Sequence, residues 1–336
     1  MIEYKKAIKD LTSKLPITED EIFDYEFSPF KEEFDQIFKF YRETLDRNAH
    51  YGIVPSFLYF TNDRSVNAAA GKYNDIYITY INMGTVVFLI SRFREKRDLL
   101  RNGENNDFVK FESRLDTTIN ELMYQEALHF TFYHEMGHLV QNSKELETKI
   151  FERVESVNGS FFLRRHVLEL DADQFSALFI GGHVVQYALS MFGEKMSKDE
   201  MIRLLVIFCS SSFFYFLSFN TNNQNIYYEE STHPHPIIRI TCVVFHIVGY
   251  CTQSLEKKGI DLNIDPKEVI NRTLDFSKEI CESPEQESLI NNYLEVIGVE
   301  AVNIQNYLKK TRALSSSDRS LASYKWNQYA TMIGNN

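Results

Sequence analysis

The residues best suited to chemistry lie in the stretch TFYHEMGHLVQ, residues 131–141, where a helix is expected. His134 and His138 are four residues apart, so on a helix their imidazoles leave one face and can bind one metal ion. Glu135 lies about 100° further round the helix, where its carboxylate can reach a water molecule without being a ligand. Metal-activated hydrolysis needs this division of roles, because zinc lowers the pKa of water towards about 7 and a free carboxylate takes the proton. The pattern predicts a hydrolytic zinc site with Glu135 as general base.

A second helix is expected to supply the ligand that the two histidines still need. In the stretch ELDAD, Glu169 and Asp173 are again four residues apart, so both project from one helix face. One carboxylate of such a pair can bind zinc, while the other accepts a hydrogen bond from a ligand histidine and fixes its tautomer. An acidic, solvated helix face is the alternative, and it fits Asp171, which points elsewhere. It fits the other two less well, because their neighbours are apolar.

Two histidines that each precede a proline form a third cluster, in the stretch STHPHPIIR before an apolar helix. Because proline is conformationally restricted, His233 and His235 are expected in rigid positions. A histidine beside zinc can donate a hydrogen bond to the oxyanion of a tetrahedral intermediate. The alternative role is to start the following helix. Taken alone, the cluster favours the helix-start role. Because the zinc motif is also present, we favour the role of oxyanion donor.

A predominantly helical framework with a small sheet must position these residues. Apolar and β-branched runs at 56–60 and 76–81 predict strands, the second paired with the segment before it. We also expect 76–81 to line the site and to pair with an extended substrate backbone. Helical periodicity predicts helices at about 30–45, 84–101, 117–141, 163–180, 197–219 and 237–253, then polar helices from 262 to 331. The predicted fold class is therefore α+β, predominantly helical.

The composition indicates an ordinary globular protein. Of 336 residues, 44% are hydrophobic and 14% aromatic, which is far more than a disordered chain carries. The 36 Lys and Arg against 47 Asp and Glu give a net charge of −11. Nucleic-acid binding favours the opposite sign, because neutralising phosphates dominates that affinity. We therefore expect no nucleic-acid partner.

The cysteines and the apolar segments indicate where in the cell the protein is expected. The four cysteines form no CxxC pair, so we expect free buried thiols in a reducing cytoplasm. No signal peptide is visible at the N-terminus. The membrane candidate, 204–219, has 16 uncharged residues, fewer than the roughly 20 that a spanning helix needs. We expect a buried helix there and no stable membrane insertion; a membrane-associated hairpin is the alternative.

Four separated segments together resemble the gluzincin zinc metallopeptidases, the superfamily that includes the CAAX-prenyl and heat-shock membrane metallopeptidases. They are VNAAA with the strand that follows it, HEMGH, ELDAD and STHPHPIIR, in the order of that family. The resemblance spans about 55–245. It implies a zincin-like metallopeptidase core with a small sheet and an active-site helix.

The resemblance also implies roles for single residues. It places one zinc ion per chain on His134, His138 and Glu169. Of the two loop histidines, His233 matches the family histidine, because an arginine follows it at the family's spacing, and it is the expected catalytic partner of Glu135. His235 is the alternative oxyanion donor. Behind the ligands, the expected supporting residues are Asp173 and Arg239.

The chain departs from that family in two respects. The flanking membrane helices are missing, and the 31-residue interval between His138 and Glu169 is shorter than expected there. The layout is more similar to soluble phage-exclusion (Lit-type) bacterial peptidases. This resemblance implies a zinc-dependent endopeptidase that cleaves a protein or peptide substrate in bacterial defence or regulation.

Other classes of function remain open at this point. The chain could be a catalytically silent zincin that serves as a sensor or scaffold, although the intact Glu135 argues against a purely structural site. It could also be a membrane-associated quality-control protease, or a hydrolase of non-peptide amides. For the domains, we expect a metallopeptidase domain at 1–255, with its core at 55–245, and a helical extension at 256–336 packed on it.

Overall fold

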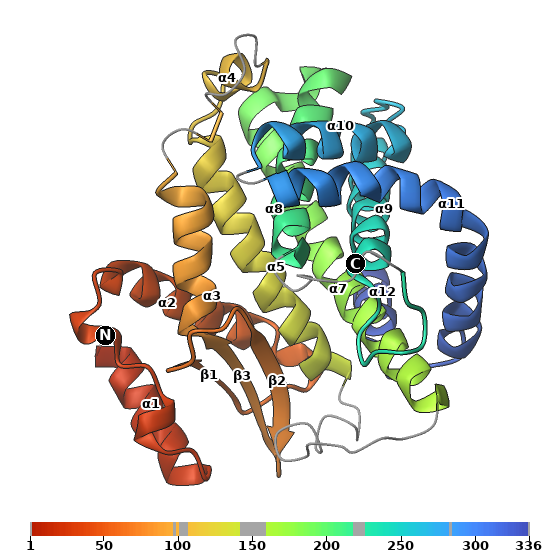
Figure 1. The fold of residues 1–336 in the computed structure, drawn as a ribbon. Coiled ribbons are helices and arrows are strands. Elements are labelled where there is room, and N and C mark those ends of the chain that lie inside the picture. The colour runs from red at the N-terminus through yellow and green to blue at the C-terminus, as the bar shows by residue number, and fades with distance from the viewer. Residues whose placement is uncertain are drawn as a thin grey trace. The chain divides into compact units, whose positions relative to one another are not determined.

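The chain folds into two compact units, each built from separate stretches of sequence (Figure 1). In this computed structural model the described residues are 2–96, 99–100, 107–141, 159–217, 226–281 and 284–334. The first unit comprises 1–89, 131–157 and 317–336, and the second unit comprises 90–130 and 158–316. Helix α5 (Ile119–Gln141) belongs to the second unit up to Phe130 and to the first from Thr131. The division into 1–255 and 256–336 stays a prediction.

The first unit combines helices with a small sheet. Its elements are α1 (Ile2–Lys14), α2 (Lys31–Arg47), β1 (Ser56–Thr61), β2 (Ala68–Tyr73), β3 (Ile76–Asn82), α3 (Met83–Leu89), the end of α5 and α12 (Ala322–Gly334), with 3-10 turns at Glu19–Glu21, Tyr25–Phe27 and Ala49–Tyr51. Aromatic side chains join them. Phe34 of α2 meets Phe60 of β1 at a ring-centroid distance of 4.9 Å, and Tyr41 of α2 stacks on Phe132 of α5 at 3.9 Å. The predicted helix at 30–45 and both predicted strands are confirmed.

The sheet has the strand order β1-β3-β2, with β3 parallel to β1 and antiparallel to β2. Asn74, at φ 53°, helps to turn the chain from β2 into β3, and asparagine tolerates this left-handed region. Because β3 lies in the centre, both of its edges are occupied. The prediction that 76–81 pairs with a substrate is therefore wrong. Among the described residues, β2 is the strand with an unpaired outer edge, since Ile22 bridges to Thr61 beside β1.

In its described residues, the second unit consists of helices and the turns and loops that join them. It contains a π-helical turn at Ile90–Arg94, α4 (Asp107–Glu112), the start of α5, α7 (Gly159–Phe192), a 3-10 turn at Gly193–Lys195, α8 (Lys198–Leu217), α9 (Pro236–Glu256), α10 (Pro266–Glu279) and α11 (Pro284–Ser315). Helices α7 and α9 approach closely at Gly181, where an added Cβ would lie 2.7 Å from Tyr250 of α9. The predominantly helical α+β class is confirmed. The single helix expected at 84–101 differs, because α3 ends at Leu89 and a π-helical turn follows.

Three helices are long and apolar enough to cross a membrane, judged by length and composition alone: Leu163–Lys195, Lys198–Leu217 and Pro236–Glu256. The sequence pointed only to the second as a membrane candidate. Its most apolar window is 83% buried inside the protein, against 44% for each of the other two. The expectation of a buried helix is thus confirmed for 204–217, and the last two residues of the predicted segment lie outside the described residues.

Candidate functional site

The two histidines of the HEMGH stretch converge on α5. Nε2 of His134 lies 3.1 Å from Nε2 of His138, and the rings are nearly perpendicular, at 87°. Both side chains are buried. Neighbouring ligand atoms on a tetrahedral zinc ion are separated by about 3.4 Å, given Zn–N distances of about 2.1 Å. The observed 3.1 Å is close to this separation, so one ion could bind both nitrogens after a small adjustment.

Gln141, which the sequence analysis missed, orients His138. Its Oε1 lies 3.0 Å from Nδ1 of His138, and both residues are buried. Because an amide oxygen only accepts hydrogen bonds, Nδ1 carries the proton and Nε2 keeps its lone pair for a metal. At the end of the same helix, Lys325 of α12 donates a hydrogen bond to the carbonyl of Val140. The spacing of three residues between His138 and Gln141 is the signal that could have identified this contact.

Glu135 is buried beside this pair, and its charge reaches the sheet of the first unit. Burial raises the pKa of the Tyr80 phenol, and the negative charges of Glu135 and Asp63 raise it further. Tyr80 of β3 is thus held as an O–H donor at neutral pH. The sequence predicts a strand at this tyrosine but indicates no role for it in the site.

The acidic pair on α7 is joined to Arg239 of α9 within the second unit. Nε and Nη2 of Arg239 donate to the two carboxylate oxygens of Asp173, at 2.8 and 2.7 Å. Nη2 also lies 3.7 Å from Oε2 of Glu169. Burial alone lowers the pKa of Arg239, but the charges and hydrogen bonds of these carboxylates outweigh burial and raise it. Arg239 therefore compensates two buried acidic side chains. Asp171 is buried as well, contrary to the solvated position expected for it.

The two loop histidines have different surroundings. Nε2 of His233 lies 3.5 Å from Oε1 of Glu169, and the His233 side chain is 55% exposed. His235 is buried, and its Nδ1 accepts a hydrogen bond from the backbone N–H of Ile237 at 3.2 Å. His235 is the N-cap residue of α9. The helix-start role that the sequence left open thus describes His235, whereas His233 faces an acidic site residue.

His166 of α7, another residue the sequence analysis missed, anchors the start of this loop. Its Nε2 donates to the carbonyl of Ser231 at 2.7 Å, and its Nδ1 lies 2.8 Å from the hydroxyl of Tyr307. Burial lowers the pKa of His166, although its hydrogen bonds oppose this. A neutral, fully buried imidazole therefore ties the loop to α7 one turn before Glu169. The only sequence signal was its position three residues before Glu169 on the same helix face.

His134 and His138 in the first unit and Glu169 in the second are all buried and of types that bind transition metals. Two imidazoles and one carboxylate are a ligand set used by catalytic zinc sites, which keep a fourth position open. The donor types therefore fit zinc.

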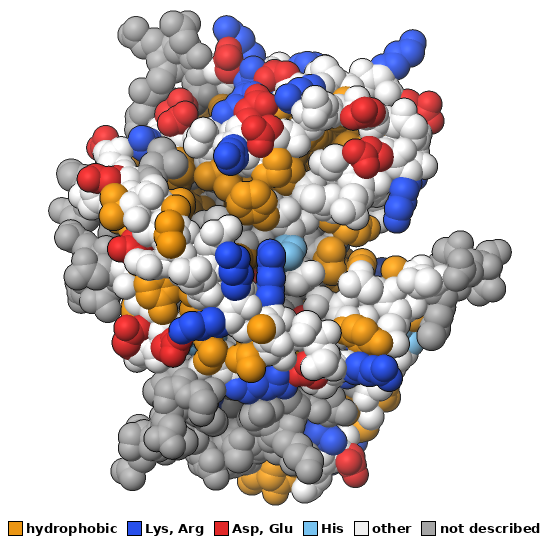
Figure 2. Space-filling model, turned by 90° about the vertical axis from the view of Figure 1, so that its right-hand side faces the viewer, with side chains coloured by type: hydrophobic (Ala, Val, Ile, Leu, Met, Phe, Trp, Pro, Cys, Tyr) orange, Lys and Arg blue, Asp and Glu red, His pale blue; other side chains and the backbone are white. Residues whose placement is uncertain are grey.

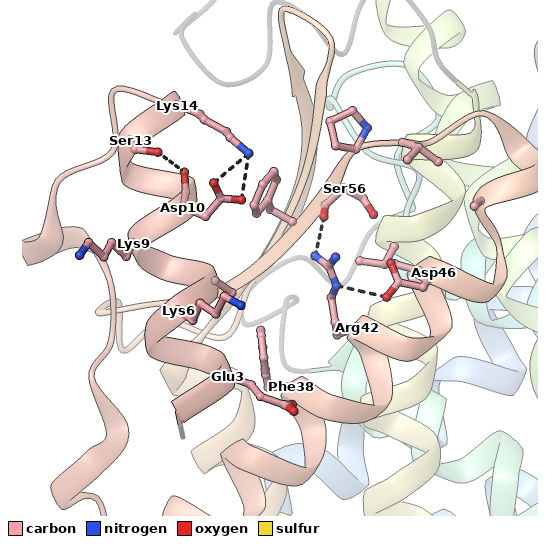
Figure 3. Close-up of a pocket in the computed structure, with 16 residues that line it drawn as sticks. Glu3, Lys6, Lys9, Asp10, Ser13, Lys14, Phe38, Arg42, Asp46 and Ser56 are labelled. Carbon is pink, nitrogen blue, oxygen red and sulfur yellow. Dashed lines mark hydrogen bonds and ion pairs between the residues drawn. The ribbon is translucent and has the colours of Figure 1, made fainter.

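Other surface features lie outside this set. A cavity of about 920 Å³ in the first unit is lined by α1, α2 and the start of β1 and contains none of the predicted site residues (Figure 3). There Arg42 donates to the carbonyl of Ser56 at 2.8 Å. On the face drawn in Figure 2, acidic and basic side chains are interspersed with exposed hydrophobic ones. The described part of that face thus lacks the single-sign basic surface typical of nucleic-acid binding.

The fold is that of a predominantly helical α+β protein, and its HExxH helix lies in a segment that matches a known protein family. Residues 89–248 match the family model described as Peptidase U49. That segment includes every predicted site residue: His134, Glu135, His138, Glu169, Asp173, His233, His235 and Arg239. The match supports a peptidase activity, and hence a hydrolase that acts on protein substrates. Comparisons with curated proteins and with solved structures found no match.

Proposed function

We propose that this chain is a zinc-dependent endopeptidase whose single catalytic zinc ion is bound by His134, His138 and Glu169. The observation that carries the proposal is the convergence of two buried imidazole nitrogens, 3.1 Å apart, in a segment that matches a peptidase family. When bound there, zinc polarises the scissile carbonyl and lowers the pKa of water towards about 7.

Glu135 acts as the general base. It follows a ligand histidine directly, yet its direction round the helix keeps it out of the ligand set. Its carboxylate takes the proton of the attacking water and then delivers it to the leaving amine. Gln141 supports this step indirectly, because it holds His138 in the tautomer whose Nε2 carries a lone pair.

His233 stabilises the developing oxyanion by donating a hydrogen bond from its ring. Its position 3.5 Å from a carboxylate oxygen of Glu169 supports this role. Arg239 and Asp173 form a bidentate pair at a neighbouring point on α7, which holds the helix that carries Glu169. These two residues act by positioning and do not touch the substrate.

We propose a cytoplasmic location and a role in bacterial defence or regulation. The similarity in layout to the phage-exclusion peptidases supports the role. The cysteines support the location, because Cys209, Cys242, Cys251 and Cys281 are all free. Burial raises the pKa of the Cys209 thiol, so that this side chain behaves as a packing group and not as a nucleophile.

The test compares wild type with Glu135→Gln in living cells. Profiling of new protein N-termini should reveal cleavage products with the wild type and lose them with Glu135→Gln, since loss of general-base catalysis costs about 10²- to 10⁴-fold. Purified Glu135→Gln should keep its zinc. Glu121→Gln, the same change on the same helix, is the matched control. If Glu135→Gln cleaves at the wild-type rate, Glu135 is not the base.

A membrane-associated protease is the second candidate, favoured by the three helices of sufficient length and apolar character. The two candidates share the same catalytic residues and differ in where the protein resides. Partitioning of the purified protein between water and lipid therefore distinguishes them.

A further inference from the structure

A second group of potential metal ligands lies in the second unit and includes no residue of the HEMGH stretch. Glu126 and His129 are three residues apart on α5, so they share a helix face, and His183 projects from α7. One ligand atom from each of the three residues lies within 4.8 Å of the other two. None of them has a role in the proposed peptidase mechanism.

Glu126 gives the strongest indication of a cation site. Its side chain is 5% exposed, and its Oε2 has no hydrogen-bond partner among the residues that the structure describes. The other oxygen, Oε1, lies 3.8 Å from Nδ1 of His183, which is longer than a hydrogen bond. A buried carboxylate in these surroundings is stabilised by a cation that both of its oxygens can reach.

The two histidines are suited to bind the same cation. The rings of His129 and His183 lie 5.2 Å apart between centroids and are inclined at 75°. Tetrahedral ligands are separated by about 3.4 Å, so the 3.8 Å between Oε1 and Nδ1 requires only a small adjustment.

A cavity of about 520 Å³ leads to these residues. Gln125 and Gln186 line it and are exposed, so the cavity opens to solvent and gives an ion a route to the ligands. At its wall, the hydroxyl of Tyr187 donates to Asp116 at 2.6 Å, which links α7 to the segment before α5. The cavity leaves space for a water molecule as a fourth ligand.

We propose that Glu126, His129 and His183 bind a divalent transition-metal ion that joins α5 to α7 in the second unit. Two imidazoles and a carboxylate suit zinc and its first-row neighbours, whereas magnesium and calcium prefer ligand sets made only of oxygen. The site shares no ligand with the proposed peptidase centre. The chain then binds two ions in place of the one expected from the sequence, and the second does not depend on the first.

The test is a calorimetric titration of the metal-stripped full chain with Zn²⁺, repeated with Co²⁺ to record the absorption of bound cobalt. Wild type should bind two equivalents. Glu126→Gln keeps the size of the side chain but removes a charged ligand. It should therefore lower the affinity for one of the two ions by more than the roughly 10- to 100-fold that is lost when a residue supporting a ligand is changed. The double variant His134→Ala/His138→Ala should keep one equivalent, and adding Glu126→Gln to it should abolish binding.

The controls separate this proposal from the peptidase site. Gln186→Ala, in the same cavity but not a ligand, should bind as wild type. If only the peptidase proposal fails, wild type binds one equivalent of zinc. Glu126→Gln then weakens this binding, and the double variant His134→Ala/His138→Ala retains it. If Glu126→Gln proves misfolded by circular dichroism, His129→Gln and His183→Gln replace it. The second site is overturned if a folded variant of Glu126, His129 or His183 binds both ions as tightly as wild type. It is also overturned if the double variant His134→Ala/His138→Ala binds no zinc.

Discussion

Two polar side chains of the candidate site depend on a neighbour that sets their chemical state. Gln141 selects the tautomer of His138, and Arg239 keeps Asp173 paired in a buried position. The sequence predicted the histidine pair from helical spacing alone. It could not predict His166, whose partner Tyr307 is 141 residues away, because only the tertiary fold brings the two together.

The two loop histidines should respond differently to removal. We expect His233→Ala to lower kcat by about 10²- to 10³-fold with KM little changed, because its ring faces Glu169 and can serve the oxyanion. His235→Ala should retain most of kcat and lose about 1 kcal/mol of stability, because His235 caps α9. Parallel kinetics and thermal unfolding, with zinc content measured, decide this. A larger kcat loss for His235→Ala would contradict the assignment.

Among the elements, the helices and two of the three strands were predictable, whereas the strand order was not. Period and length located α2, α5, α7 and α9 to within a few residues at most of their ends. Strand β2, by contrast, has the sequence AAAGKY, which is poor in the β-branched and aromatic residues that mark a strand. Strand order depends on contacts between distant segments, so a pattern of alternation cannot show which strand lies at the edge.

The outer edge of β2 is defined by its hydrogen bonds. The N–H of Asn82 donates to the carbonyl of Asn67 at 3.0 Å, and alternate residues of an antiparallel strand face its partner. Asn67 and Ala69 therefore face β3, whereas Ala68 and Ala70 face outward. The N–H of Ala68 already donates to the side chain of Asn67. The outward backbone of Ala70 is therefore the position at which we test pairing of an extended substrate with β2, although only 5% of this residue is exposed.

Proline at position 70 should impair substrate binding without disrupting the sheet. Because the N–H of Ala70 points outward, Ala70→Pro removes no bond to β3, and edge strands tolerate proline there. We expect KM to rise about 3- to 10-fold, the equivalent of one hydrogen bond, with zinc retained. Ala69→Pro is the matched control and should lower the melting temperature, because its N–H faces β3. An unchanged KM for folded Ala70→Pro would show that substrate does not pair at this edge.

At the scale of the whole molecule, composition predicted a globular, acidic protein but not its division into two interleaved units. The reason is that α5 continues without a break from one unit into the other. Nothing in a continuous helical pattern marks such a boundary. Composition also could not show whether the apolar helices are buried in the protein or span a membrane, because both kinds of helix have similar length and hydropathy.

We expect the purified protein to remain in the aqueous fraction when it is floated with liposomes. The apolar window of α8 is 83% buried within the protein, and α7 and α9 are joined by the charged pair of Asp173 and Arg239. Phe245 of α9 is 45% exposed, so Phe245→Asp tests a single hydrophobic contact with lipid. Wild type and variant should behave alike. Flotation of the wild type that Phe245→Asp abolishes would favour the membrane-associated protease.

The uninterrupted course of α7 limits how this chain can evolve. His166, Glu169, Asp173 and His183 lie on that one helix, and each faces a partner fixed elsewhere in the second unit. Adding or deleting one residue between 166 and 183 would turn the remainder of the helix by about 100° and shift it by about 1.5 Å. No single contact could absorb that change. Related chains can therefore exchange many side chains along α7, but they must keep the number of residues between its polar positions.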